Sequence, residues 1–198
     1  MESGIRYSRA LPQSDPARLD DMLADTPSKV DFIHVDIMDG DFVPGIMTNT
    51  AFLRALREKS TRPLELHFSM RDAENRLQWF GVTAGDRVAI HAEATFRLNR
   101  ALDAVRKLGA SPLIALNPST PLRFIEELLP AADGVLLLNV KLGFRGAYLV
   151  PAALEKIRRL ADLRAQTGGA YSIAVEGCVS DQTAPDLIRV GADWLVLP

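Results

Sequence analysis

The segment His34-Val35-Asp36-Ile37-Met38-Asp39-Gly40 lies at the end of an apolar run. Side chains in a β-strand alternate between its two faces, so His34, Asp36 and Met38 share one face. An imidazole and a carboxylate that project together from the carboxyl end of a strand can bind one divalent metal ion. The segment therefore predicts a strand that ends at a functional site.

Two other apolar runs also end in residues that can bind a metal. Leu64-Glu65-Leu66-His67 ends in a second histidine, and Ala174-Val175-Glu176-Gly177 brings a second carboxylate. Because each group closes a different predicted strand, the sequence predicts a metal site at one mouth of a barrel. Two neutral imidazoles with two carboxylates suit Zn²⁺, Fe²⁺, Mn²⁺ or Co²⁺.

Short apolar runs alternate with helix-like segments along the whole chain. The runs begin near Ile5, Val30, Leu64, Val88, Leu113, Val135, Ser172 and Trp194, and helical segments follow Asp15-Pro16, Asp72, Thr95, Thr120-Pro121, Pro151 and Asp181. Eight strands alternating with seven helices predict a TIM (β/α)₈ barrel, a single domain over residues 1–198 that lacks the last helix. The four candidate ligands fall at the carboxyl ends of strands, where this fold carries its chemistry.

Composition narrows the class of function. The chain has 198 residues and a formal net charge of −2, and no basic stripe favours nucleic acid or an anionic membrane surface. The longest apolar runs are far too short to span a membrane. The single cysteine, Cys178, excludes an intrachain disulfide, and the polar start at Met1 has no signal-peptide pattern. We therefore expect a cytoplasmic protein.

Several motifs resemble those of the ribulose-phosphate 3-epimerase family over nearly the whole length. The most specific is the segment 34–40 followed by Phe42-Val43-Pro44. Others are Leu66-His67, His91-Ala92-Glu93-Ala94-Thr95, Asn117-Pro118-Ser119-Thr120-Pro121 and Gly191-Ala192-Asp193. The resemblance implies a phosphate-binding barrel that inverts C3 of a pentulose 5-phosphate, converting ribulose 5-phosphate to xylulose 5-phosphate or acting on a related ketose phosphate. It also implies a homo-oligomer.

The resemblance assigns roles to particular residues. One divalent metal ion is expected on His34, Asp36, His67 and Glu176, with Asp36 and Glu176 as the acid/base pair on opposite faces of the substrate. The residues expected to bind the small phosphorylated sugar are Ser8, His34, Met38, His67, Gly143, Phe144, Arg145, Gly146 and Gly177.

The chain departs from the family pattern at several points. Glu176 stands where the family has Asp, and Cys178 where it has glycine. Ser69 and Leu138 replace two methionines that line the family's metal site, and Pro198 occupies the place of a phosphate-binding glycine. The loop that reads Asn-Pro-Gly-Phe-Gly-Gly-Gln in the family is Lys141-Leu142-Gly143-Phe144-Arg145-Gly146-Ala147 here.

These departures leave a second hypothesis, a non-catalytic or repurposed barrel used for binding or scaffolding. A related decarboxylase or aldolase is disfavoured, because Met38 stands where an Asp-x-Lys-x-x-Asp motif requires lysine. For single residues, Glu176 has an alternative as a salt-bridge partner of Lys141 or Arg145. Asp39 is expected to brace the turn at Gly40.

Supporting or structural roles are expected for His91 and Glu93. With no final helix, we also expect exposed apolar surface around Trp194, covered by another subunit.

Overall fold

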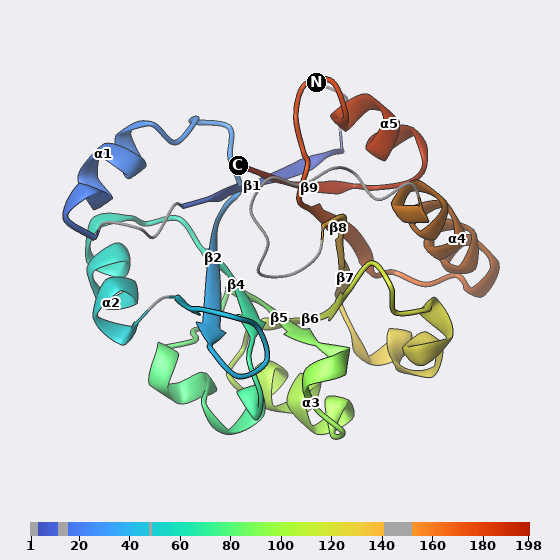
Figure 1. Ribbon diagram of the computed structural model, residues 1–198, viewed down its shortest axis with the longest axis horizontal. Helices are drawn as coiled ribbons and strands as arrows, with labels where there is room; N and C mark the ends of the chain where they lie inside the picture. Colours follow the sequence, from blue (N-terminus) through green and yellow to red (C-terminus); the bar gives the residue numbers. More distant parts are fainter. Residues whose placement is uncertain (1–3, 12–15, 48, 141–151) are drawn as a thin grey trace.

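Eight parallel strands close into a barrel, and helices surround it (Figure 1). The computed structural model describes residues 4–11, 16–47, 49–140 and 152–198. The barrel strands are β1 (Arg6–Ala10), β2 (Phe32–Asp39), β4 (Leu64–Ser69), β5 (Arg87–His91), β6 (Ser111–Leu116), β7 (Gly134–Leu138), β8 (Ser172–Glu176) and β9 (Trp194–Leu197). The predicted TIM barrel is confirmed.

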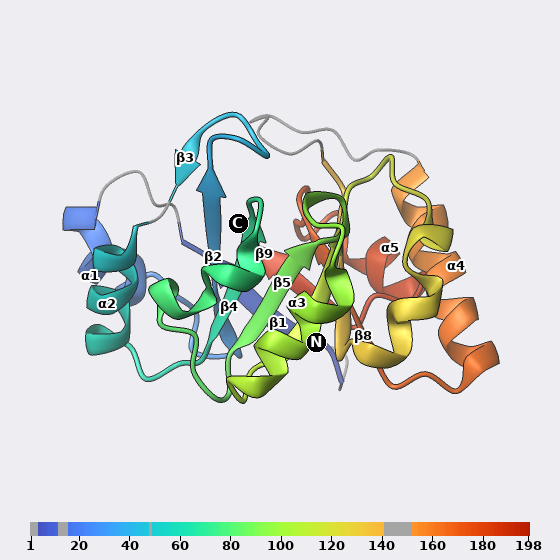
Figure 2. The same cartoon turned by 90° about the horizontal axis from the view of Figure 1, so that it is seen from below.

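The barrel closes through its first strand, which pairs on both sides. Strand β1 pairs in parallel with β2, where Ala10 lies opposite His34, and with β9, where Ser8 lies opposite Val196. A short strand, β3 (Ile46–Met47), pairs antiparallel with the end of β2. In the side view, β2 and β5 point toward the same mouth, which also carries β3 (Figure 2).

Helical segments occupy the connections between successive barrel strands, as predicted. The α-helices are α1 (Leu19–Ala24), α2 (Thr50–Lys59), α3 (Leu98–Lys107), α4 (Ala152–Thr167) and α5 (Ala184–Arg189). The 3₁₀ helices are η1 (Pro16–Arg18), η2 (Ala73–Asn75), η3 (Leu77–Phe80), η4 (Ala92–Ala94), η5 (Leu122–Phe124) and η6 (Glu126–Ala131). No helix follows β9 in the part of the chain that the structure describes.

Local sequence explains where the α-helices begin and end. The side chain of Asn49 accepts a hydrogen bond from the backbone N–H of Phe52 at 2.9 Å, which caps α2. Helix α3 buries residues spaced three and four apart, and a left-handed glycine, Gly109 with φ of +78°, follows it. Its buried residues are Leu98, Ala101, Leu102 and Val105.

Two predicted helices differ from the structure. The segments after Asp72 and after Thr120-Pro121 form pairs of short 3₁₀ helices rather than α-helices. Asp72 itself has a left-handed backbone and provides no side-chain cap, and Gly81 ends η3 with φ of +60°. In the second segment Pro130 lies inside η6, where it has no N–H to donate.

The core has two layers, one between the strands and the helices and one inside the barrel. The inner layer is apolar where β6 to β9 face the axis, through Leu113, Leu136, Leu138, Trp194 and their neighbours. It is polar where β2, β4 and β5 face it, through buried histidine, glutamate and arginine side chains. Trp194 is only 2% exposed, so the expectation of exposed apolar surface at this residue was wrong. Its ring faces the barrel interior beside Phe32.

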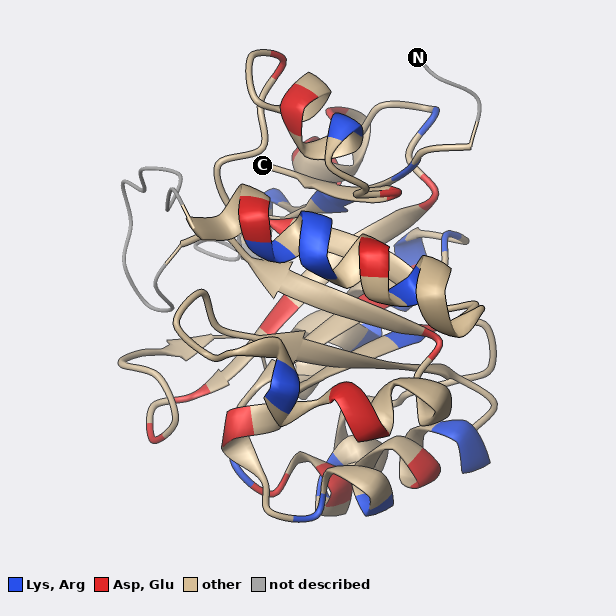
Figure 3. Ribbon diagram, turned by 90° about the vertical axis from the view of Figure 1, so that its right-hand side faces the viewer, with Lys and Arg blue, Asp and Glu red and all other residues tan. Residues whose placement is uncertain are grey.

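Charged residues are distributed over the outer helices, the loops and the strands. On the side covered by α4 and α5, acidic and basic residues are interspersed, with neither sign gathered into a stripe (Figure 3). None of the helices in the described residues is both long and apolar enough to span a bilayer.

Candidate metal centre

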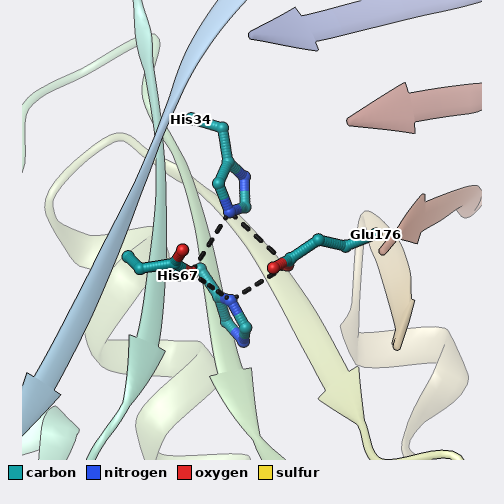
Figure 4. Close-up of side chains that lie close together, drawn as sticks. His34, His67 and Glu176 are labelled. Atoms are coloured by element: carbon teal, nitrogen blue, oxygen red, sulfur yellow. Dashed lines mark hydrogen bonds and ion pairs between the residues drawn. The ribbon is translucent and has the colours of Figure 1, made fainter. Parts of the chain in front are cut away.

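Three barrel strands bring together the four side chains predicted from the sequence, although His34 lies near the start of its strand rather than at the carboxyl end. His34 and Asp36 come from β2, His67 from β4 and Glu176 from the end of β8. Asp36 and His67 are direct partners in the β2–β4 register. Glu176 extends from the opposite side of the barrel toward both imidazole rings (Figure 4). One potential ligand atom from each residue lies within 4.8 Å of all the others.

Each carboxylate contacts both rings. Asp36 Oδ1 lies 2.9 Å from His67 Nδ1 and 3.4 Å from His34 Nε2. Glu176 Oε2 lies 3.1 Å from the same nitrogen of His67 and 3.4 Å from the same nitrogen of His34. The two histidines therefore present different ring nitrogens, Nδ1 from His67 and Nε2 from His34, to one shared centre.

Exposure divides the four residues into two kinds. The side chains of His34 and His67 are completely buried, whereas those of Asp36 and Glu176 are 30% and 18% exposed. The rings thus form the floor of the site. The carboxylates line its open side, where a ligand that enters the barrel mouth would meet them.

The pKa values of the histidines reflect the two carboxylates that lie against their rings. Burial by itself lowers the pKa of His67, but Glu176 and Asp36 outweigh it and raise the pKa to about 9. The pKa of His34 is also raised, since its burial is outweighed by Glu176, Asp36 and Glu65. Burial alone raises the pKa of Asp36, but hydrogen bonds and charge from both histidines lower it far below the usual range. The site favours positive charge between its carboxylates.

The donor set fits a divalent metal ion. A tetrahedral zinc with bonds of about 2.0–2.2 Å has neighbouring ligand atoms about 3.3–3.6 Å apart. The four nitrogen–oxygen separations here are 2.9–3.4 Å, and all four ligand atoms lie within 4.8 Å of one another. Glu176 Oε2 is buried and receives no well-aligned hydrogen bond from the described residues. Two neutral imidazoles and two carboxylates carry a charge of −2, which a divalent cation would neutralise.

A buried acid contacts the other ring nitrogen of His34. Glu65, which is fully buried, lies beside His34 in the β2–β4 register, and its Oε1 lies 2.9 Å from His34 Nδ1. Its other oxygen lies 3.2 Å from Arg87 Nε, and the Arg87 guanidinium stacks over the ring of Trp194, 3.3 Å from the centroid. His34 and Arg87 lower the pKa of Glu65 against the effect of burial, so the acid is ionised.

A second chain of contacts leads away from His67. Its Nε2 lies 2.9 Å from His91 Nε2, and His91 Nδ1 lies 2.9 Å from Glu93 Oε2. Glu93 Oε1 accepts hydrogen bonds from the backbone N–H of Asn117 and from the hydroxyl of Thr120. Burial raises the pKa of Glu93, but His91 and Thr120 lower it more, to about 2.

The other residues predicted to bind substrate differ in position. Ser8 is fully buried on β1, and its hydroxyl accepts a hydrogen bond from Trp194 Nε1 at 2.7 Å. Met38 is half-buried on the His34 face of β2, and Gly177 follows Glu176 with φ of +90°. Gly143, Phe144, Arg145 and Gly146 lie outside the described residues, as does Lys141.

Some contacts bear on the alternatives left open by the sequence. Asp39 Oδ1 accepts hydrogen bonds from the N–H groups of Asp41 and Phe42, so its predicted turn-bracing role is confirmed. Ser69, at a position where the family has methionine, places its hydroxyl 3.3 Å from His67 Nε2. Leu138, at the other such position, packs in the inner apolar layer.

Glu65 had no predicted role, although the sequence contains a signal for one. An acid two residues before His67 on the same strand points to the same side as the histidine, which is the barrel interior. Because a charged residue is rarely buried without a partner, such an acid indicates a buried cation or hydrogen-bond donor beside it.

Comparisons with known proteins place the chain in a family. The model of the ribulose-phosphate 3 epimerase family matches residues 8–198. A ribulose-phosphate 3-epimerase of Treponema pallidum is 32% identical over 197 residues, 99% of this chain and 90% of that protein. The Bacillus subtilis protein of the same name is 32% identical over 196 residues, 97% of this chain and 89% of that one.

A solved structure supports the fold alone. A mutant tryptophan synthase alpha-subunit from Pyrococcus furiosus superposes with a TM-score of 0.70 at 18% identity, covering 97% of this chain and 86% of that one.

Proposed function

Because this chain belongs to the ribulose-phosphate 3-epimerase family, we propose that it is an isomerase that inverts C3 of a pentulose 5-phosphate or a related ketose phosphate. The observation that carries the proposal is the convergence of His34, Asp36, His67 and Glu176 at the carboxyl mouth of the barrel. Two carboxylates there approach one centre from different strands, as an inversion at carbon requires.

The proposed acid and base are Asp36 and Glu176. A proton on a carbon next to a ketone is weakly acidic, so its removal needs a base within reach and stabilisation of the negative charge that forms. Asp36 is strongly ionised and would take the C3 proton from one face of the substrate. Glu176, which extends from the other side of the barrel, would return a proton on the other face. Both are partly exposed at the mouth.

His34, Asp36, His67 and Glu176 would hold the divalent ion. When bound, the ion would act as a Lewis acid that stabilises the charge developing on the substrate oxygens. The proposal includes Zn²⁺, Fe²⁺, Mn²⁺ and Co²⁺ as candidate metals.

Of the remaining predicted substrate contacts, Met38 and Gly177 border the mouth and are retained in the proposal. Ser8 is retained as well, but a direct contact requires its hydroxyl to leave the bond to Trp194.

The test is an assay of C3 inversion on ribulose 5-phosphate and related ketose phosphates, together with metal analysis. We expect about one divalent ion per chain and exchange of the C3 proton with solvent deuterium. Metal-loaded protein that neither inverts nor exchanges any ketose phosphate would overturn the proposal. That result would instead favour the second candidate, a barrel retained for binding or scaffolding.

The last part of the proposal concerns domain number, cellular location and assembly. We propose one domain that works in the cytoplasm as a homo-oligomer. Large apolar side chains exposed on the described surface, those of Ile46, Trp79, Phe96 and Phe124, are compatible with subunit contacts. Light scattering that finds only monomer at micromolar concentration would contradict the assembly.

A further inference from the structure

Two ring nitrogens in hydrogen-bond contact constrain where protons lie around His67. His67 Nε2 and His91 Nε2 are 2.9 Å apart and both rings are completely buried. A hydrogen bond between two imidazole nitrogens needs one N–H and one lone pair, because two N–H groups or two lone pairs repel. The proton on one ring therefore determines the tautomer of the other.

The far end of the chain determines the direction of this hydrogen bond. Glu93 Oε2 lies 2.9 Å from His91 Nδ1, and a carboxylate oxygen can only accept there. His91 must then carry its proton on Nδ1, which leaves a lone pair on Nε2. His67 in turn donates from Nε2. Its Nδ1 faces Asp36 and Glu176, so Nδ1 is the nitrogen whose proton a bound cation would replace.

Glu93 is itself held in place. Its Oε1 accepts from the backbone N–H of Asn117 at 2.9 Å and from the Thr120 hydroxyl. Lys156 binds the backbone carbonyls of Asn117 and Thr120, which fixes the same loop. The acid is therefore oriented by two donors on one side, and its second oxygen is directed at His91.

We propose that His91 and Glu93 form a positioning relay that holds His67 in the tautomer required to bind the metal through Nδ1. His34 needs the opposite tautomer, with its proton on Nδ1, and receives it from direct contact with Glu65 Oε1. The two ligand histidines are thus fixed in opposite tautomers by two buried acids, one directly and one through a second imidazole. The inference rests on the metal centre of the proposed function.

Metal affinity tests the relay without a measurement of turnover. Co²⁺ is titrated into metal-free protein and followed by visible absorbance, with Zn²⁺ competition to obtain the dissociation constant. His91→Leu removes the acceptor, and we expect binding about 10–100-fold weaker, as is usual for the loss of a hydrogen-bond partner of a ligand histidine. His91→Gln places an amide oxygen near the same position and is expected to restore much of the affinity. Glu93→Gln should weaken binding as His91→Leu does.

A matched control separates the relay from general damage to the fold. Asp86 and Glu93 are acids at opposite ends of β5. Asp86 is buried and accepts from the backbone N–H groups of Leu64 and Thr83 and from Arg57. Asp86→Asn should lower stability yet leave Co²⁺ affinity within about twofold. Far-UV circular dichroism and urea unfolding accompany every variant.

Imidazole ¹⁵N shifts provide a direct readout. In Zn²⁺-loaded wild type, His67 should be protonated at Nε2 and His34 at Nδ1. Affinity in folded His91→Leu equal to wild type, or a proton on His67 Nδ1 in the loaded protein, would overturn the relay. A wild-type protein that binds neither Co²⁺ nor Zn²⁺ would overturn the metal centre itself, and the relay with it.

Discussion

Asp36 and Glu176, the proposed acid and base, have unequal surroundings. Asp36 Oδ1 is hydrogen-bonded to His67 at 2.9 Å, whereas Glu176 Oε2 approaches both rings without a well-aligned hydrogen bond. Asp36 is therefore the more firmly fixed of the pair, and the Glu176 carboxylate has more freedom to adjust to a substrate.

Substitution of one carboxylate should separate proton exchange from inversion. In Glu176→Gln, we expect net inversion to fall by about 10²–10⁴-fold, the usual worth of a general acid or base. Asp36 should still exchange the C3 proton of one epimer with solvent, because its face of the substrate is untouched. Proton NMR in D₂O measures both rates, and Glu176→Asp serves as the control that keeps the charge. Inversion at the wild-type rate in Glu176→Gln would contradict the assignment.

Cys178 has a backbone conformation that suits glycine, with φ of +54°. Left-handed backbone costs a residue with a Cβ roughly 1–2 kcal/mol, and glycine avoids most of this. We expect Cys178→Gly to unfold with a free energy about 1 kcal/mol higher than Cys178→Ala, because both lose the thiol and only alanine keeps the strain. Urea denaturation compares the two, and equal stability would argue against strain at this position.

At this scale the sequence predicts which residues meet but not how they are oriented. His34, Asp36, His67 and Glu176 could be predicted because parallel strands end at a common mouth and side chains alternate. The bonds from Glu65 to His34 and from His91 to His67 could not, since they depend on side-chain rotamers and on the stagger of neighbouring strands.

Among the elements, the junction after β8 is tightly packed. Gly177 has φ of +90°, and a Cβ there would lie 2.8 Å from both methyl carbons of Val140. We expect Gly177→Ala to lower the free energy of unfolding by about 2–4 kcal/mol, combining backbone strain with overpacking. Gly168→Ala is the control, because its φ of +65° is also left-handed but no atom lies within 4 Å of the added Cβ. Equal losses in the two variants would show that the Val140 contact costs nothing.

The α-helices were more predictable than the 3₁₀ segments. Helix α3 has apolar residues at helical spacing up to a terminal glycine, so its pattern, its burial and its end all agree. The segments 73–80 and 122–131 also have apolar residues at intervals that suit a helix. There Gly81 ends η3 in a left-handed conformation and Pro130 supplies no N–H inside η6, so neither segment continues as a longer helix.

For the whole molecule, the metal centre should contribute to stability. Its ligands come from three strands on both sides of the barrel, so the unfolded chain cannot present them together. At free metal a hundredfold above the dissociation constant, binding adds about 2.7 kcal/mol, which corresponds to roughly 5–10 °C in Tm for a chain of this size.

Calorimetry with and without a chelator measures this difference, and Asp36→Asn should abolish most of it. An unchanged Tm on chelation would show that no metal is held by the native barrel.

The pairing of β1 with β9 also constrains how the chain can fold as it is made. Ser8 and Trp194, which meet inside the barrel, are 186 residues apart in sequence. At about 5–20 residues per second, a ribosome adds the second roughly 10–40 s after the first. Throughout that interval β1 can pair with β2, but its other edge has no neighbour to cover it and is open to pairing with other chains. The nascent sheet therefore has an open edge at β1 until its last strand arrives.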